Sequence, residues 1–262
     1  MKQLLIIIII SLLSIPVFSE NTPWEQNLAT GLTLSQASFS NWAAGGENSL
    51  SWQFNIDGTF NKNMNQDTWT NSLKLIYGET KQGSSSAKKS ADELRAESTY
   101  IFNKKTNYVS VVFLSQLAKG IDYSSSSAQT VSYFFDPAYF TESMGFEFET
   151  TQTIITRLGL ALKQTLVNKS TLTTTQSEAG GEFVAKYSDT LFDNLLASST
   201  LQLFSKFTLI KEIDLYWDNS FSQKLSNNIN WVLGINLIYN RDVSSKIQVR
   251  QTFGLQYNFN LI

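Results

Sequence analysis

The sequence predicts an all-β protein, an up-and-down antiparallel transmembrane β-barrel of about twelve strands. Three observations predict it. Apolar and polar residues alternate with a period of two from Leu28 onward, tight turns alternate with longer connections, and aromatic residues recur eight positions apart on the apolar face. A period of two is that of a strand with two unlike faces, whereas helical periodicity is nearly absent.

The composition excludes several classes of protein. Only 16% of the 262 residues are charged, against about 25% in an ordinary soluble domain. The net charge of −2 leaves no electrostatic footprint for nucleic acid. His and Cys are both absent, which removes disulfides, thiolate or imidazole metal sites and His-dependent catalytic triads. We therefore expect no cofactor, no metal and no nucleic-acid partner.

The N-terminus has the pattern of an export signal. A basic Met1-Lys2 precedes an apolar run from Leu4 to Ile15, and a cleavage site follows Ser19. The alternative, an anchoring helix, is disfavoured because the apolar run before Pro16 is too short to cross about 30 Å of hydrocarbon. We expect residues 1–19 to be a signal peptide, residues 20–27 a periplasmic lead-in and residues 28–262 the barrel.

Strands are expected wherever the alternation is sustained. In one of them, Leu233, Ile235 and Leu237 alternate with Gly234 and Asn236. The alternation is poor in 107–118 and 194–205, so the facing of those two segments stays open. The expected strands are 28–38, 48–61, 67–80, 93–103, 107–118, 138–149, 154–165, 180–188, 194–205, 212–222, 228–240 and 246–261.

The connections fall into two classes that alternate along the chain. Tight polar turns are expected at 62–66, 103–106, 150–153, 188–194 and 223–227, and longer connections at 83–92, 120–137 and 167–179. This alternation is typical of an outer-membrane barrel with short periplasmic turns, long outer loops and both termini in the periplasm. The join at 207–211 is short for an outer loop.

A soluble β-sandwich or lipocalin-like barrel is the alternative, because alternation alone says only that one strand face is buried. Two features favour the membrane barrel. The polar faces are rich in Asn, Gln, Ser and Thr rather than in charge. The aromatic pairs Trp52 and Phe60, Trp69 and Tyr77, and Trp231 and Tyr239 are each eight residues apart. Eight tilted residues rise about 21 Å, close to the ~25 Å apolar band between aromatic girdles.

One segment after the first strand does not alternate. It reads Phe39-Ser40-Asn41-Trp42-Ala43-Ala44-Gly45-Gly46-Glu47-Asn48-Ser49. It resembles the hallmark of a family of uncharacterised exported proteins of Bacteroidota and relatives, a domain of unknown function. A second motif of that family, of the form F-x-P-A-Y in the middle of the chain, has its counterpart in Phe135-Asp136-Pro137-Ala138-Tyr139. The resemblance covers nearly the whole mature chain and implies an outer-membrane barrel with no assigned activity. The chain departs from typical barrels in ending on Leu261-Ile262 rather than on an aromatic residue.

The segment from Asn41 to Glu47 has two interpretations. Gly45-Gly46 permits positive φ in a sharp turn, with the large amphipathic Trp42 beside it. The first interpretation is an outer turn with Trp42 against the barrel rim, and the second is an inward-folded plug or ligand contact.

Charged residues on the polar faces are expected to point into the lumen. Six are basic and six acidic, which fits a network of ion pairs because buried charges must be paired. They are Asp57, Lys74, Arg95, Glu97, Glu147, Arg157, Lys163, Glu182, Lys186, Asp214, Asp218 and Arg250.

Three function classes follow from a polar lumen. The first is a passive channel or uptake barrel for small solutes, in the outer membrane of a Gram-negative-type bacterium, with outer-membrane lipid and the barrel assembly machinery as partners. The second is a sealed structural or binding barrel that displays its loops. The third is a membrane-embedded hydrolase, which without His would need an unusual carboxylate or Ser-Lys arrangement, and Glu147 or Asp214 has no recognisable partner motif. We therefore expect no enzyme.

Overall fold

The computed structural model describes residues 23–38, 47–122, 129–169, 172–192, 194–210, 212–241 and 245–260. The expected signal peptide lies outside the described residues. So do Asn41 to Gly46 of the non-alternating segment and the C-terminal Leu261-Ile262. Within the described ranges, no helix is long and apolar enough to cross a membrane.

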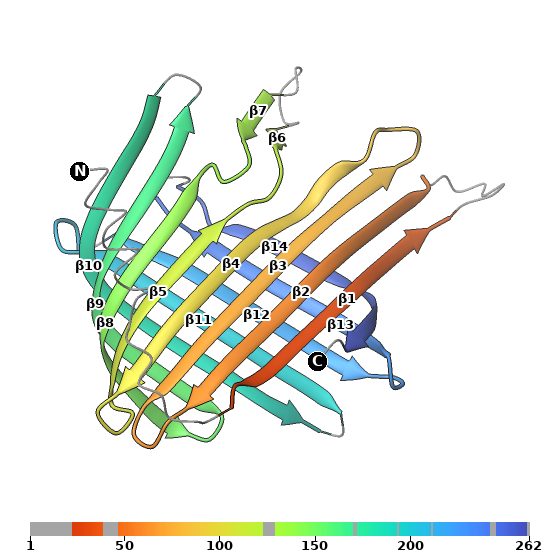
Figure 1. Ribbon diagram of the computed structural model, residues 1–262. Coiled ribbons are helices and arrows are strands. Elements are labelled where there is room, and N and C mark those ends of the chain that lie inside the picture. The colour runs from red at the N-terminus through yellow and green to blue at the C-terminus, as the bar shows by residue number, and fades with distance from the viewer. Residues whose placement is uncertain are drawn as a thin grey trace.

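The described chain forms a closed antiparallel barrel of twelve strands, in which each strand pairs with its neighbours around the ring (Figure 1). The all-β, up-and-down barrel predicted from the sequence is confirmed. The barrel strands are β1 (Glu25–Ala37), β2 (Ser49–Asn63), β3 (Thr68–Gln82), β4 (Lys88–Phe102), β5 (Asn107–Ser115), β8 (Ala138–Thr151), β9 (Ile154–Lys169), β10 (Leu172–Leu191), β11 (Leu195–Lys206), β12 (Ile213–Lys224), β13 (Ile229–Tyr239) and β14 (Gln248–Asn260).

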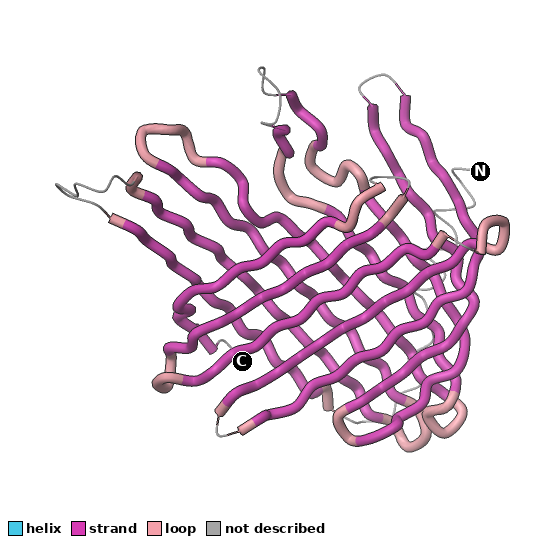
Figure 2. The backbone as a smooth tube through the Cα atoms, turned by 180° about the vertical axis from the view of Figure 1, so that it is seen from behind, coloured by secondary structure: helices cyan, strands magenta, loops and turns pink. Residues whose placement is uncertain are grey.

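The connections separate to the two ends of the barrel. One end, which we call the turn end, carries the connections 64–67, 103–106, 152–153, 192–194 and 225–228. The other, the loop end, carries the connections 38–48, 83–87, 116–137, 170–171, 207–212 and 240–247. Within 116–137, β6 (Gly120–Asp122) and β7 (Gln129–Ser132) pair in a separate two-stranded sheet that projects beyond the barrel (Figures 1 and 2).

Several boundaries differ from the sequence prediction, three of them at the start of a strand that begins inside an expected connection or lead-in. Residues 172–179 were expected in a loop, but β10 begins at Leu172 and pairs with β9 from Lys169 onward. Similarly, β4 begins at Lys88, inside the expected connection 83–92, and β1 begins at Glu25, inside the expected lead-in. These extensions lie at strand ends, where neither face is held to an apolar surface, so no alternation marks them.

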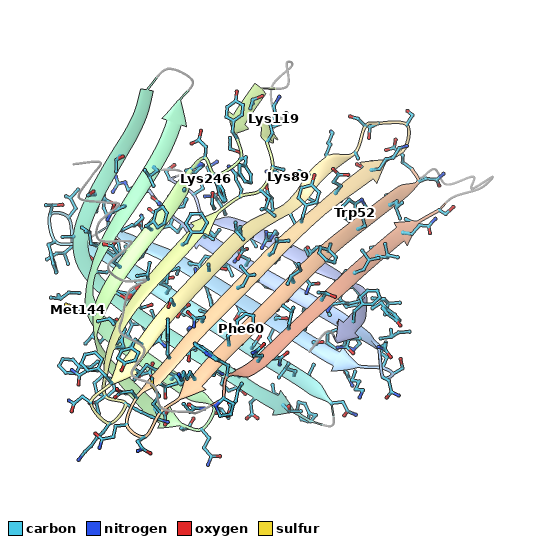
Figure 3. The ribbon with its side chains drawn as sticks, in the orientation of Figure 1. Trp52, Phe60, Lys89, Lys119, Met144 and Lys246 are labelled. Carbon is cyan, nitrogen blue, oxygen red and sulfur yellow. The ribbon has the colours of Figure 1, made fainter. Side chains whose placement is uncertain are left out.

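The outward face of the barrel is apolar and exposed, as a lipid-facing surface must be. Phe253 is 66% exposed, Leu160 60% and Met144 59%. The aromatic residues occupy two levels, since Trp52 lies nearer the loop end and Phe60 nearer the turn end (Figure 3). Trp52 packs on Tyr77 of the next strand with ring centroids 5.8 Å apart.

The facing of the two poorly alternating segments is now decided. Tyr108, Ser110 and Val112 of β5 are buried on the inner face, and the valines between them point outward. In β11, Gln202 and Phe204 face inward, opposite Tyr216 and Asp214 of β12. The alternation of apolar and polar residues is poor in both segments because apolar residues such as Tyr108, Val112 and Phe204 also occupy the inner face.

Among the described residues, the seam that closes the barrel has the shortest register of the ring. There β1 pairs with β14 from Ala29 with Asn260 to Leu34 with Leu255. By contrast, β1 pairs with β2 over its whole length, from Glu25 to Ala37.

The facing can be tested on two adjacent residues of β14. Phe253 points outward, whereas Thr252 points inward toward Gly234. We expect Phe253→Arg to lower the free energy of unfolding by about 2–4 kcal/mol, because it places a charge in lipid, and Thr252→Arg to cost clearly less. Urea unfolding in lipid vesicles measures both, and a loss for Thr252→Arg equal to or larger than that for Phe253→Arg would contradict the assigned facing.

Candidate functional site

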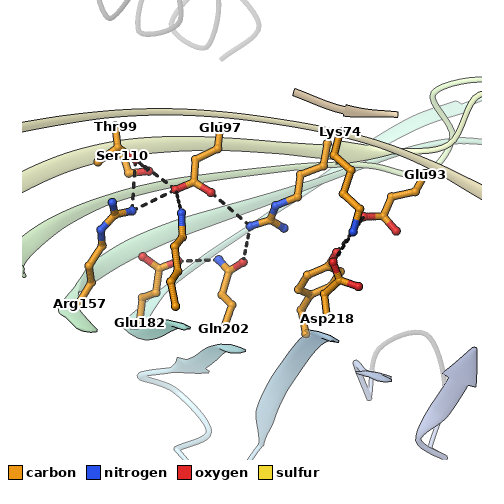
Figure 4. Close-up of polar contacts among 12 residues, drawn as sticks. Lys74, Glu93, Glu97, Thr99, Ser110, Arg157, Glu182, Gln202 and Asp218 are labelled. Carbon is orange, nitrogen blue, oxygen red and sulfur yellow. Dashed lines mark hydrogen bonds and ion pairs between the residues drawn. The ribbon is translucent and has the colours of Figure 1, made fainter. Parts of the chain in front are cut away.

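Three consecutive inward residues of β4 form the centre of the lumen. Glu93, Arg95 and Glu97 stand at alternating positions, so all three side chains leave the same face of the strand. Each contacts residues of strands that are not neighbours of β4 in the ring. The centre of the lumen is therefore crossed by side chains from opposite walls (Figure 4).

Glu97 is the most heavily coordinated carboxylate. It accepts hydrogen bonds from Arg157 Nη1 of β9 at 3.0 Å and from Lys186 Nζ of β10 at 2.7 Å. Arg157 also donates through Nε to Glu147 at 2.6 Å. Arg157, Glu97 and Glu147 are each less than 9% exposed. Such a group is stable only as a set, because each buried charge depends on its partners.

A second chain of contacts runs from Arg95 to the opposite wall. Its guanidinium donates to Gln202 Oε1 at 3.0 Å and lies 4.8 Å from the centroid of the Tyr216 ring. Gln202 in turn donates to Glu182 at 2.6 Å. Tyr108, 1% exposed, donates to the same carboxylate at 3.4 Å.

Gly159 makes room for Tyr108. A Cβ at this position would collide with the tyrosine hydroxyl, and Gly145 lies directly opposite Gly159 on the neighbouring strand. Gly159 thus leaves space for the buried Tyr108 side chain, and Gly145 allows the close approach of the backbone at Leu158 and Gly159.

A third set of contacts joins β3, β4, β12 and β14. Lys74 bonds to Asp218 across the lumen and lies 3.8 Å from Glu93. Glu93 also accepts from Arg250 at 2.8 Å and from the Tyr216 hydroxyl at 2.8 Å. We call these three sets together the ion-pair layer.

Nearer the loop end, a separate group of charges lines the wall. Lys163 bonds to Asp214 and lies 3.9 Å from Glu178. Lys206 pairs with Glu178 at 3.1 Å and with Glu212 at 3.4 Å. The inner wall is thus paired at two levels.

The structure brings the charges predicted for the lumen together. Ten of the twelve form ion pairs with one another or with Glu93 and Glu178. Glu182 is held by the Gln202 and Tyr108 hydrogen bonds, and Asp57 accepts from Asn55 at 2.8 Å.

Sequence reasoning missed Glu93, Glu178, Lys206 and Glu212. Glu93 has the same parity as Arg95 and Glu97, and that signal could have found it. Glu178 fell in an expected loop, and the other two lie at or beyond strand ends. Of the segment from Asn41 to Glu47, only Glu47 is described, and it packs against Gly83, a turn residue with φ of +53°.

One sector of the lumen wall is lined by small and amide side chains. We call it the amide sector, made of Gly31, Thr33, Asn55, Gln256 and Asn258 of β1, β2 and β14. A Cβ at Gly31 would meet the side chains of Gln256 and Asn55, so these groups share the inner face. Gln256 donates to Asn258 at 2.5 Å. The neighbouring Asp57 is exposed although it lies on the inner face of β2.

A cavity of about 390 Å³ lies between the ion-pair layer and the loop end. Arg95, Tyr216 and Gln202 are shared by the layer and the cavity wall, and Tyr139, Asn236 and Gln248 also line it. Among the residues that the structure describes, no three acidic, His or Cys side chains are grouped so that they could hold a metal ion.

Comparison with known proteins gives a partial family match. The family model described as "Protein of unknown function (DUF3078)" matches residues 34–121. The resemblance to an uncharacterised family is confirmed over these residues. The Phe135 to Tyr139 segment lies outside the match, and the bacterial group remains a prediction. No curated protein matches the chain.

Solved outer-membrane barrels are similar in fold. An outer-membrane channel of Pseudomonas putida F1 has a TM-score of 0.42 and 7% identity, covering 93% of this chain and 97% of that one. The β domain of the Bordetella autotransporter Brka has a TM-score of 0.36 and 12% identity, with 89% and 98% covered. The translocator domain of NalP from Neisseria meningitidis has a TM-score of 0.36 and 13% identity, with 95% and 93% covered. At these scores the function has to be argued from the chain's own residues.

The ion-pair layer yields a stability prediction. Glu97→Gln leaves Arg157, Lys186 and Arg95 without their shared carboxylate, so we expect the free energy of unfolding to fall by about 3–5 kcal/mol. Glu149→Gln, a loss of the same charge from an exposed residue near the turn end of β8, should change it by less than about 0.5 kcal/mol. Denaturant titration in vesicles measures both, and an unchanged midpoint for Glu97→Gln would contradict the arrangement.

Proposed function

We propose that this protein is an outer-membrane barrel that passes small polar solutes through its lumen. One observation carries the proposal: Asp57 is exposed to solvent although its side chain lies on the inner face, beside the uncharged amide sector. The charges of the ion-pair layer form ion pairs with one another. The amide sector is therefore the proposed route for water and solute. A wall of amides and hydroxyls replaces water contacts of a polar solute without binding it tightly.

The location belongs to the same proposal. We infer that residues 1–19 are removed on export, that the assembly machinery of the outer membrane inserts the chain, and that its lasting partner is outer-membrane lipid. The exposed apolar outer face supports this location, as does the finding that five of the six loop-end connections are longer than any turn-end connection; the connection at 170–171 is the exception.

A sealed barrel is the second candidate. The contacts between opposite walls favour it, above all Arg95 with Gln202 and Lys74 with Asp218, because they narrow the lumen at its centre. In that case the function would lie in the surfaces beyond the wall, such as the long β9 and β10 hairpin.

We do not propose catalysis. In the carboxylate form of a hydrolase without His, a free carboxylate would serve as the base, and the carboxylates considered for that role are engaged: Glu147 with Arg157 and Asp214 with Lys163.

The location predicts a simple fractionation result. We expect the mature protein in the detergent-resistant outer-membrane fraction, and a faster band on SDS gels before boiling than after it, because a closed ladder has no free edge at which unfolding can begin. Recovery of the protein in the soluble periplasmic fraction would rule out the membrane location.

Planar-bilayer recording tests passage. With Glu93, Glu178, Lys206 and Glu212 added to the twelve predicted lumen charges, the inner wall carries seven basic and nine acidic residues. We therefore expect a small conductance with a reversal potential close to zero and shifted slightly toward cations across a salt gradient. Asp57→Asn should shift the reversal potential toward anions, because it removes a charge beside the route. Asp189→Asn, in the exposed turn end of β10, serves as the control and should not shift it. Absence of current in the wild-type protein would favour the sealed barrel.

A further inference from the structure

We propose that the cavity at the loop end binds an uncharged, hydroxyl-rich ligand of about one or two sugar units. The inference deepens the proposed function, because it names the class of solute that would enter the lumen, but equilibrium binding does not require that the lumen conducts. The volume of the cavity, about 390 Å³, lies within the range of small-molecule sites.

The charges in the cavity wall are balanced and already engaged. Lys163 bonds to Asp214, and Arg250 bonds to Glu93. Asp92 accepts from Lys89 at 2.6 Å and from the backbone N–H groups of Leu117 and Ala118 at 2.7 and 2.9 Å. A charged ligand would have to break one of these pairs, so the wall disfavours anions and cations alike.

The wall also contains a donor without an acceptor. Asn236 of β13 is 5% exposed, and its Nδ2 makes no hydrogen bond within the described part of the chain. It stands between Asp218 and Arg250 on the neighbouring strands. Asn236 is one of the residues that line the cavity, so a ligand oxygen that reaches this side chain can accept from its donor. An apolar ligand would leave the donor unsatisfied, which disfavours that class.

Aromatic and amide side chains complete the wall. Phe204, Tyr139 and Tyr216 supply ring surface, and Gln248 supplies an amide at the start of β14. Rings pack against the C–H faces of a sugar while amides bond to its hydroxyls, so both surfaces of such a ligand are met. This combination, without a free charge, points to an uncharged carbohydrate rather than to a peptide terminus or a phosphate.

Calorimetric titration of the purified full-length barrel tests the inference, in a detergent without a sugar headgroup. Maltose and sucrose are the probes, and gluconate is the charged control. We expect binding of at least one disaccharide with a Kd on the order of 1 mM or tighter, and no binding of gluconate. Absence of heat with both sugars, or preference for gluconate, would overturn the inference.

Matched variants in one strand locate the site. Asn236→Leu removes the donor and should weaken disaccharide binding about tenfold. Asn230→Leu, near the turn end of β13 and bonded to Ser222, should leave binding unchanged. The thermal midpoint of both variants verifies folding, and equal affinities for the two would place the ligand elsewhere. Disaccharide binding without bilayer current would leave this inference standing while the proposed passage fails, and current without binding would do the reverse.

Discussion

Closure of the hydrogen-bonded ladder is the constraint on which the rest of this structure depends. In lipid, a strand edge without a partner leaves backbone groups unsatisfied, so a membrane sheet must return to its first strand. Here β14 returns to β1 through the register from Ala29 with Asn260 to Leu34 with Leu255. Once the ring closes, every strand of the barrel has one outward face and one face toward the lumen, and the period of two follows along the strands.

The closed ring imposes a second problem, which is how to fill its interior. Apolar residues are needed on the outside, so polar and charged residues collect inside. The chain offsets the cost of their desolvation by pairing them both across the lumen and between neighbouring strands. Glu97 receives Arg157 and Lys186 from the far side, and Arg95 reaches Gln202 there. The ion-pair layer ties opposite walls together, while the amide sector remains uncharged and Asp57 exposed.

This division of the lumen relates the two candidate functions. A lumen crossed everywhere by ion pairs would be closed, whereas a lumen without such pairs would be a wide pore. The ion-pair layer narrows the lumen, and the cavity lies between this layer and the loop end. Tyr216 belongs to both, because it donates to Glu93 of the layer and lines the cavity. Stability and solute contact thus share residues, so changes in the layer alter both.

The sequence by itself determined the barrel, the alternation of its connections and the face of most charged residues. Lys74 and Asp218 were both placed inward by parity, because facing depends only on neighbouring residues in a strand. The sequence did not determine that Lys74 and Asp218 meet. They are 144 positions apart, and their contact depends on strand tilt and on the register of every strand pair between β3 and β12. The sequence did not place Glu178 on the inner wall for a related reason. Its part of β10 lies before the alternating segment and is recognised as strand by its pairing with β9. Cross-lumen partners, the cavity and the unpaired donor of Asn236 are properties of the closed ring, and only the tertiary structure decided them.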